Sequence, residues 1–238
     1  MLLLALLLAA APQLTADEIV ARHVEARGGA ARLKAIQSLR LEGKIVFGGG
    51  EGAVTAEASQ LMKRPDSIRR EFSLQGLTGI DGFDGKESWS ADPFGGRRDA
   101  FRTSADDARA LSVDADFEGP LVDAQAKGHR VEYLGTEDVD GTPALKLRIS
   151  LKNGDTIYTF LDPDYFLEIR RITQRMVRGS ERISETDFGS YVQVDGIQVP
   201  GSIESGRKGA PDKQGIIIDK VEANVPIDDA MFHFPASK

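Results

Sequence analysis

The spacing of hydrophobic residues divides the chain into a short helical start and a long β-rich remainder. Over residues 17–27 the apolar side chains, among them Ile19 and Val24, recur at helical spacing, and Gly28-Gly29 ends the helix. Residues 30–37 predict a second, short helix. From Ser38 onward the apolar residues alternate with polar ones, which is typical of a half-buried strand.

This alternation continues almost to the C-terminus, with turn residues such as Asp140-Gly141 and Asn153-Gly154 between the strands. It predicts strands over 38–47, 54–62, 68–74, 80–83, 87–90, 129–138, 142–151, 155–161, 166–177, 181–191, 197–204 and 215–223. The exception is 104–126, where Ser104, a set of acidic residues and then Ala and Leu predict one or two helices, interrupted at Gly119-Pro120.

Sequential hairpins with few helices predict an α+β fold built on one strongly curved antiparallel sheet. We expect an unclosed β-barrel of about 10–11 strands, with the helices covering its open face. A curved sheet that is closed only in part by helices can enclose a ligand cavity.

The residues that alternate inward on the first strands are apolar, so the matching ligand would be an acyl chain or a lipid. The predicted lining residues are Leu41, Ile45, Phe47, Val54, Met62, Ile68, Phe72 and Leu74. The alternative is that the helices fill this space and that the same residues form an ordinary core.

Residues 1–16 are typical of an export signal, because an apolar run over 1–11 is followed by Pro12 and by a small residue, Ala16, at the expected cut. The alternative is a buried N-terminal helix. We expect residues 17–238 to form a single domain in the periplasm, with secretion from the cell as the less favoured alternative. Its sequence contains no further apolar stretch long enough to cross a membrane.

The composition excludes or disfavours several classes of function. Among 238 residues there is no Cys, which excludes a disulfide, a thiol nucleophile and a lipid-modified N-terminal Cys. The net charge of −7 disfavours binding to nucleic acid. The three His are too few and too scattered for a metal site. We therefore expect no metal and no cofactor.

Catalytic motifs are absent from the sequence. It has no G-x-S-x-G elbow and no paired His spacing, so we expect no catalytic residues and no enzyme. A basic strand pair carries Arg170, Arg171, Arg175, Arg178 and Arg182. The interleaved Glu168, Glu181 and Glu185 indicate cross-strand ion pairing rather than a phosphate site.

A series of short motifs resembles the LolA/LolB-like superfamily of outer-membrane lipoprotein carrier and sorting proteins. The motifs, whose order and spacing carry the resemblance over about residues 16–235, are Leu61 to Asp66 (LMKRPD), Asp84-Gly85-Lys86 with Trp89, Asp92-Pro93-Phe94, Phe160 to Pro163, Asp195-Gly196-Ile197 with Pro200, Asn224 to Asp228 and Phe232 to Pro235.

The resemblance implies an unclosed barrel with a helical lid over a hydrophobic cavity, which Trp89 would also line. It implies that Arg64 lies beside the cavity and holds the lid through backbone carbonyls. Arg70 alternates in phase with Ile68 and Phe72, so it would point inward, toward a headgroup or a lid acid.

The function that the resemblance implies is shielding of a lipid or of the acyl chains of a lipoprotein. Partners would be that lipid or lipidated protein, together with inner- or outer-membrane envelope proteins. The alternative is an envelope sensor or scaffold that acts by protein contacts on the same fold.

Overall fold

The computed structural model describes residues 14–48 and 52–235. Most of the expected signal segment and the centre of the Gly-rich turn at 48–52 lie outside the described residues.

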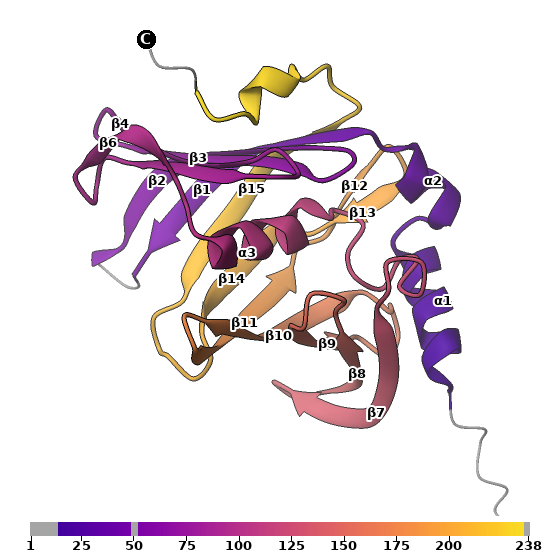
Figure 1. Ribbon diagram of the computed structural model, residues 1–238. Coiled ribbons are helices and arrows are strands. Elements are labelled where there is room, and N and C mark those ends of the chain that lie inside the picture. Colours follow the sequence, from indigo (N-terminus) through magenta and orange to yellow (C-terminus); the bar gives the residue numbers. More distant parts are fainter. Residues whose placement is uncertain (1–13, 49–51, 236–238) are drawn as a thin grey trace, which may run out of the picture.

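One antiparallel sheet contains thirteen of the strands found in these residues, and it confirms the curved, unclosed sheet that the sequence predicts (Figure 1). In spatial order they are β6 (Arg97–Arg102), β5 (Ser88–Asp92), β4 (Leu77–Phe83), β3 (Ser67–Leu74), β2 (Val54–Lys63), β1 (Ser38–Phe47), β15 (Gln214–Ala223), β14 (Ser202–Arg207), β11 (Ser180–Gly189), β10 (Glu168–Val177), β9 (Thr156–Leu161), β8 (Thr142–Ser150) and β7 (Arg130–Val139). A separate two-stranded ribbon pairs β12 (Val192–Val194) with β13 (Ile197–Val199).

The two arms of the sheet join where the first strand pairs with the last. β1 pairs with β15, and its register shifts between Glu42 and Gly43. A Cβ on Gly43 would lie 2.0 Å from the carbonyl oxygen of Ile217, so only glycine fits this close approach of the two backbones.

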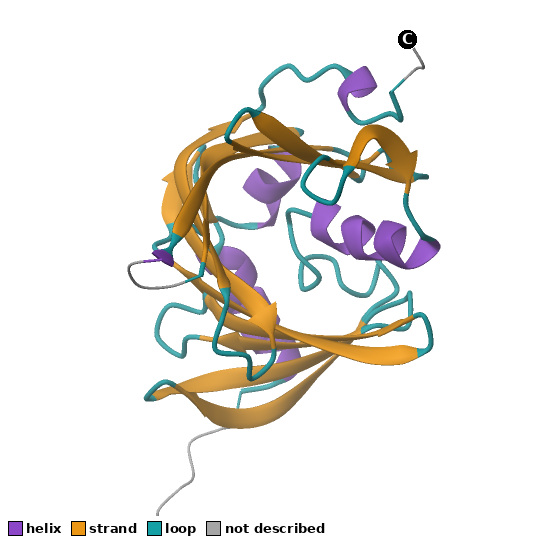
Figure 2. Ribbon diagram, turned by 90° about the vertical axis from the view of Figure 1, so that its left-hand side faces the viewer, coloured by secondary structure: helices purple, strands orange, loops and turns teal. Residues whose placement is uncertain are grey.

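The opening of the sheet lies between its edge strands β6 and β7, which are consecutive in the chain but do not pair with each other. The segment that joins them contains α3 (Ala105–Ala115), which lies on the concave side of the sheet (Figure 2). Ser104 and Asp107 form a capping box that fixes the start of this helix.

Two further helices, α1 (Ala16–Ala26) and α2 (Ala30–Ala35), lie at one end of the sheet (Figure 1). Thr15 caps α1 and forms a capping box with Glu18. A short 3-10 turn, η2 (Asp229–Met231), follows β15 and lies on the convex side of β2 and β3, opposite α3.

Three expectations need correction. The large sheet has more strands than expected, because β6 was missed: its sequence, RRDAFR, is largely charged, as an edge strand can be. Residues 116–128 form turns rather than a second helix after α3. The helices also do not form a layer over the open face, since α3 alone lies on the concave side and α1 and α2 stand at one end.

Candidate functional site

The predicted lining residues other than Val54 and Trp89 fall into two groups. Leu41, Met62 and Ile68 are buried in a packed core with α2, with the end of α3 and with Val122 of the segment that follows. These three residues therefore form an ordinary core beneath the helices, which was the alternative interpretation.

A second group lies farther along the same face, toward the turn that joins β1 and β2. Ile45, Phe47, Phe72 and Leu74 are only half-buried there. The ring of Phe72 stacks on that of Phe94 at 5.0 Å between centroids, and it meets Phe47 edge to face at 6.4 Å. We call Phe47, Phe72 and Phe94 the aromatic cluster; Val54, which pairs with Phe47, is exposed.

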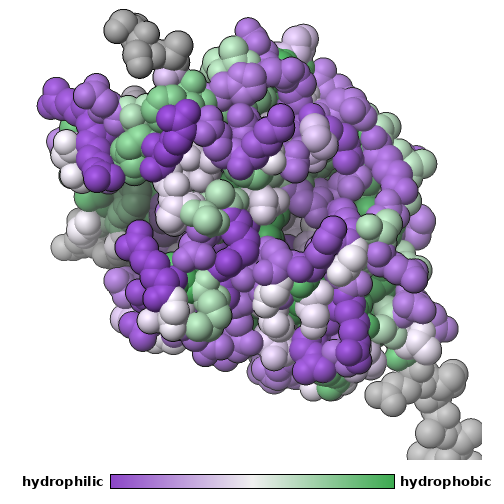
Figure 3. Space-filling model, in the orientation of Figure 1, coloured by the Kyte–Doolittle hydropathy of each residue, from purple (hydrophilic) through white to green (hydrophobic). Residues whose placement is uncertain are grey.

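Hydrophobic surface is visible in a recess on the left-hand side of Figure 3, beneath the end of the sheet that carries β4 and β6. Phe94 of the aromatic cluster is 43% exposed, which is unusual for a phenylalanine. This end of the concave face therefore presents apolar surface that no part of the described chain covers fully.

Trp89 does not line the concave face. The strand registers align Leu61, Arg69, Gly82 and Trp89 in one row, and Leu61 packs against Ile227 and Phe232 on the convex side. The indole N–H of Trp89 donates to the Phe232 carbonyl at 2.8 Å. Because side chains alternate along a strand, Ser88 and Ser90 face inward and Trp89 faces outward.

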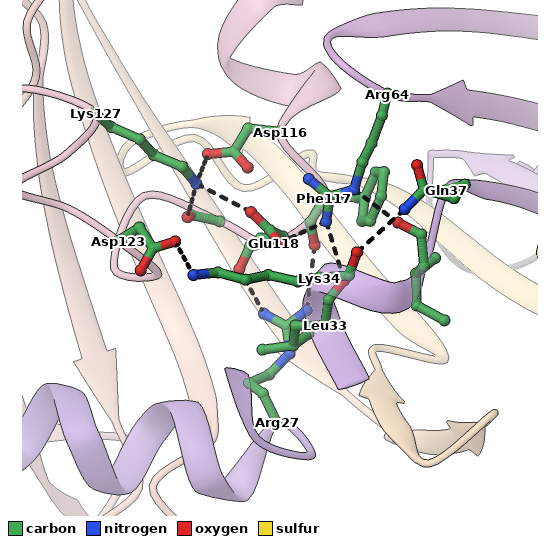
Figure 4. Close-up of polar contacts among 12 residues, drawn as sticks. Arg27, Leu33, Lys34, Gln37, Arg64, Asp116, Phe117, Glu118, Asp123 and Lys127 are labelled. Atoms are coloured by element: carbon green, nitrogen blue, oxygen red, sulfur yellow. Dashed lines mark hydrogen bonds and ion pairs between the residues drawn. The ribbon is translucent and has the colours of Figure 1, made fainter. Parts of the chain in front are cut away.

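Arg64 stands at the end of β2 and ties the sheet to α2 and to the segment after α3 (Figure 4). Its Nε donates to the Ile36 carbonyl at 2.7 Å, and its Nη2 donates to the Leu33 carbonyl at 3.0 Å. Nη2 also lies 2.5 Å from a carboxylate oxygen of Glu118, which is buried. The guanidinium covers the ring of Phe117 at 4.8 Å.

The segment 116–128 is held by cations from three different elements (Figure 4). Arg27 of α1 donates to the carbonyls of Phe117 and Glu118, at 3.2 Å and 3.3 Å. Lys34 of α2 pairs with Asp123 at 2.6 Å. Together with Arg64, these contacts connect the chain on the C-terminal side of α3 to α1, to α2 and to the end of β2.

Arg70 points inward, toward an acid of α3. Its Nη1 lies 3.0 Å from a carboxylate oxygen of Asp114, and its Nε donates to Gln60 at 2.8 Å. Both members of the Arg70–Asp114 pair are more than one-third exposed, so the pair adds little stability. At the other end of α3, the Arg178 N–H donates to Asp106 at 2.9 Å, and Arg109 donates to the Met176 carbonyl.

A buried polar cluster lies beneath α1. Arg171 donates twice to Glu168, at 2.9 Å and 2.5 Å, and His23 Nδ1 lies 2.8 Å from the Phe166 carbonyl. Burial, together with the nearby charge of Arg27, lowers the pKa of His23 to about 4, so the imidazole is neutral at pH 7. Although burial opposes ionisation of Glu168, Arg171 and Thr159 hold the pKa of its carboxyl below the usual range.

His23 and Glu168 are both buried, and protein partners satisfy both of them. Within residues 14–48 and 52–235, no group of three or more His, Asp or Glu side chains could hold a metal ion. In the same residues, no helix has the length and apolar character needed to span a membrane.

An unclosed antiparallel barrel with a helix on its concave side is the architecture that the resemblance to LolA-like proteins implies. Solved structures confirm this resemblance at the level of the fold. A DUF1329 family protein from Desulfovibrio piger has a TM-score of 0.63 at 14% identity, over 92% of this chain and 97% of that one. A LolA superfamily protein from Nitrosomonas europaea has a TM-score of 0.61 at 11% identity, over 93% and 98%.

An outer membrane lipoprotein-sorting protein domain from Vibrio parahaemolyticus also has this fold, with a TM-score of 0.58 at 10% identity over 90% of this chain and 94% of that one. No family model matches the sequence, and no curated protein matches it either. At identities of 10–14%, these structures show that the chain shares this fold.

Proposed function

We propose that the protein is a periplasmic carrier that shields a lipid, or the acyl chains of a lipoprotein, on the concave face of its sheet. The observation that carries the proposal is the aromatic cluster, which leaves half-buried apolar side chains on the same face as α3. Likeness to a lipoprotein-sorting domain supports this choice of ligand.

In this proposal α3 and the segment 116–128 act as the lid. The segment joins the two unpaired edges of the sheet, so its displacement would widen the opening without breaking a strand pair. Arg64, which is anchored on α2 by the Leu33 and Ile36 carbonyls, would hold the lid closed through Glu118, and Arg70 would do so through Asp114.

We also propose that residues 1–16 are the export signal and that residues 17–238 form one LolA-like domain. Thr15 caps α1 in the described chain, so a cut after Ala16 would remove this cap. N-terminal sequencing of the exported protein tests the position of the cut. A cut on the C-terminal side of Asp17, or no cut in a fractionated periplasm, would contradict the proposal.

Binding of a fluorescent fatty-acid probe tests the carrier function. We expect the substitution Phe72→Asn to weaken probe binding at least about tenfold, because a buried phenyl ring contributes about 1.5–3 kcal/mol. Met176→Asn is the matched control, since Met176 is an exposed apolar residue on another strand.

Organic extraction and mass spectrometry of the purified wild-type protein supply an independent measurement. Bound lipid in the extract, together with probe binding that depends on Phe72, supports the carrier. If no lipid is found and no fatty probe binds, the carrier proposal fails. Capture of a single envelope protein by the lipid-free chain would then favour the alternative, a sensor or scaffold.

A further inference from the structure

A basic pocket opens where β10, β11 and β14 end, beside α3. It has a volume of about 700 Å³ and is lined by Arg175, Glu181, Arg182, Ser184, Arg207 and Lys208. This volume lies within the usual range for small-molecule sites, about 300–1,000 Å³. Four cations and one carboxylate line the pocket, whereas the chain as a whole carries a net charge of −7.

The strand register forces two of these cations together. Arg175 of β10 lies directly opposite Arg182 of β11, and Arg207 of β14 lies opposite Ser184, two residues along the same strand. Like charges directly opposite each other destabilise a sheet. An anion bound between them would remove this repulsion.

The neighbouring arginines show what ordinary pairing looks like in this sheet. Arg170 of β10 lies 2.5 Å from Asp187 of β11, which is cross-strand ion pairing of the kind that the sequence predicts. Arg171 lies 2.5 Å from Glu168, but this pair lies within β10. Ion pairing does not continue to the end of the hairpin that β10 and β11 form. Among the described residues, Arg182, Arg207 and Lys208 form no ion pair.

Arg175 reaches from the pocket toward the interior. Its Nε is buried and has no hydrogen-bond partner in the described chain. The closest carboxylate belongs to buried Asp155, 3.7 Å away, and the same carboxylate lies 3.5 Å from Nε of Arg109 on α3. Arg109 also pairs with Asp106 at 3.2 Å, so Asp155 is the carboxylate that Arg175 faces. The excess of positive charge lies at the pocket itself, where Arg182, Arg207 and Lys208 accompany Arg175.

We infer that the basic pocket binds a phosphate-type anion. Guanidinium groups suit this ligand because their planar N–H donors form paired hydrogen bonds with phosphate oxygens. The inference rests on the proposed function in one respect, namely that the anion is the headgroup of the carried amphiphile. Because strands lie about 4.8 Å apart, β14 is only about 10 Å along the sheet from β1 and its Phe47.

Titration calorimetry with three probes tests the inference on the full chain. The probes are a short-chain phosphatidic acid, the diacylglycerol with the same acyl chains, and inorganic phosphate. We expect phosphatidic acid to bind at least about tenfold more tightly than the diacylglycerol, and this advantage to shrink at high salt. Phosphatidic acid that also binds far more tightly than inorganic phosphate identifies a lipid headgroup, and equal affinities identify a free anion.

A double variant, Arg182→Gln with Arg207→Gln, should remove this advantage and leave diacylglycerol binding unchanged. The matched control is Lys86→Gln with Lys152→Gln, which removes the same charge from exposed positions outside the pocket. Circular dichroism shows whether each variant is folded. If the double variant is folded and binds phosphatidic acid within twofold of the wild type, the anion site is wrong.

The two proposals fail separately. Equal binding of the diacylglycerol and phosphatidic acid, insensitive to the variant, would overturn the anion site and leave the carrier intact. Phosphate binding that the double variant abolishes, with no binding of either lipid, would support the anion site and overturn the carrier. Absence of binding by both anions overturns the anion site.

Discussion

Replacement of Arg64 by methionine tests whether this one side chain fastens the sheet to α2 and to the segment 116–128. The substitution keeps a long apolar stem but removes the donors to the Ile36 and Leu33 carbonyls. It also removes the closer of the two cations beside Glu118, the other being Lys127 at 3.7 Å. Removal of one member of a buried ion pair costs about 3–5 kcal/mol. Because the Arg64 side chain is 27% exposed, we take the lower end, about 3 kcal/mol.

For a domain of this size, a loss of about 3 kcal/mol lowers the melting temperature by about 6–12 °C. Urea unfolding at pH 7 measures the free energy, and calorimetry measures the melting temperature. The free energy of unfolding of Arg64→Lys should lie between those of the wild type and the methionine variant, since an ammonium group keeps the charge but cannot reproduce the planar set of donors.

Arg102→Met is the matched control. Arg102 also pairs with a glutamate, Glu87, at 2.6 Å, but the side chains are 61% and 41% exposed, so its loss should cost less than about 1 kcal/mol. A double-mutant cycle between Arg64 and Glu118 should give a coupling energy of at least about 1 kcal/mol. If Arg64→Met lowers the free energy of unfolding by no more than Arg102→Met does, Arg64 is not the residue that fastens the sheet to α2 and to the segment 116–128.

Three further predictions concern Arg70, His23 and Gly43. Arg70→Gln should change the free energy of unfolding by less than about 1 kcal/mol and raise the association rate of a fatty probe in stopped-flow fluorescence; an unchanged rate would argue against α3 as a lid. The pKa of His23 is about 4 when folded and about 6.5 when unfolded, so the unfolded chain binds the extra proton between these values; stability should fall by about 2 kcal/mol from pH 7 to pH 5, and His23→Gln should remove that fall in urea titrations. Gly43→Ala should cost at least about 2 kcal/mol, because its Cβ would meet the Ile217 carbonyl, and a variant of wild-type stability would show that the β1–β15 contact can relax.

The sequence predicted the general fold because alternation and turn residues are local signals. The hairpins at Asp140-Gly141 and Asn153-Gly154 join the expected strands. Trp89 shows where local signals end. Its spacing from Asp84-Gly85-Lys86 places it on a strand, but the face it occupies depends on its register with Gly82 and on cover by Phe232, 143 residues later.

The arrangement of the arginines was harder to predict, because it depends on the partners that the fold supplies. Arg64 was singled out by its motif, whereas Arg27 carried no local sign that it would donate to the carbonyls of Phe117 and Glu118. Arg175 and Arg171 belong to the same charged run. Strand register places Arg175 opposite Arg182, whereas Arg171 pairs with Glu168 three residues earlier on its own strand, and composition does not distinguish the two cases.

The balance of energies decides whether α3 can serve as a lid. Only Ala115 of this helix is buried, while Ala108, Leu111 and Val113 are partly buried against the cores, and the pair that joins it to β3 is exposed by more than one-third. Release of α3 from the sheet should therefore cost only a few kcal/mol, on the scale of about 0.8 kcal/mol for each methylene group exposed. Burial of an acyl chain of about twelve methylenes gains roughly 10 kcal/mol on the same scale, which exceeds this cost, so ligand binding can displace α3 from the sheet.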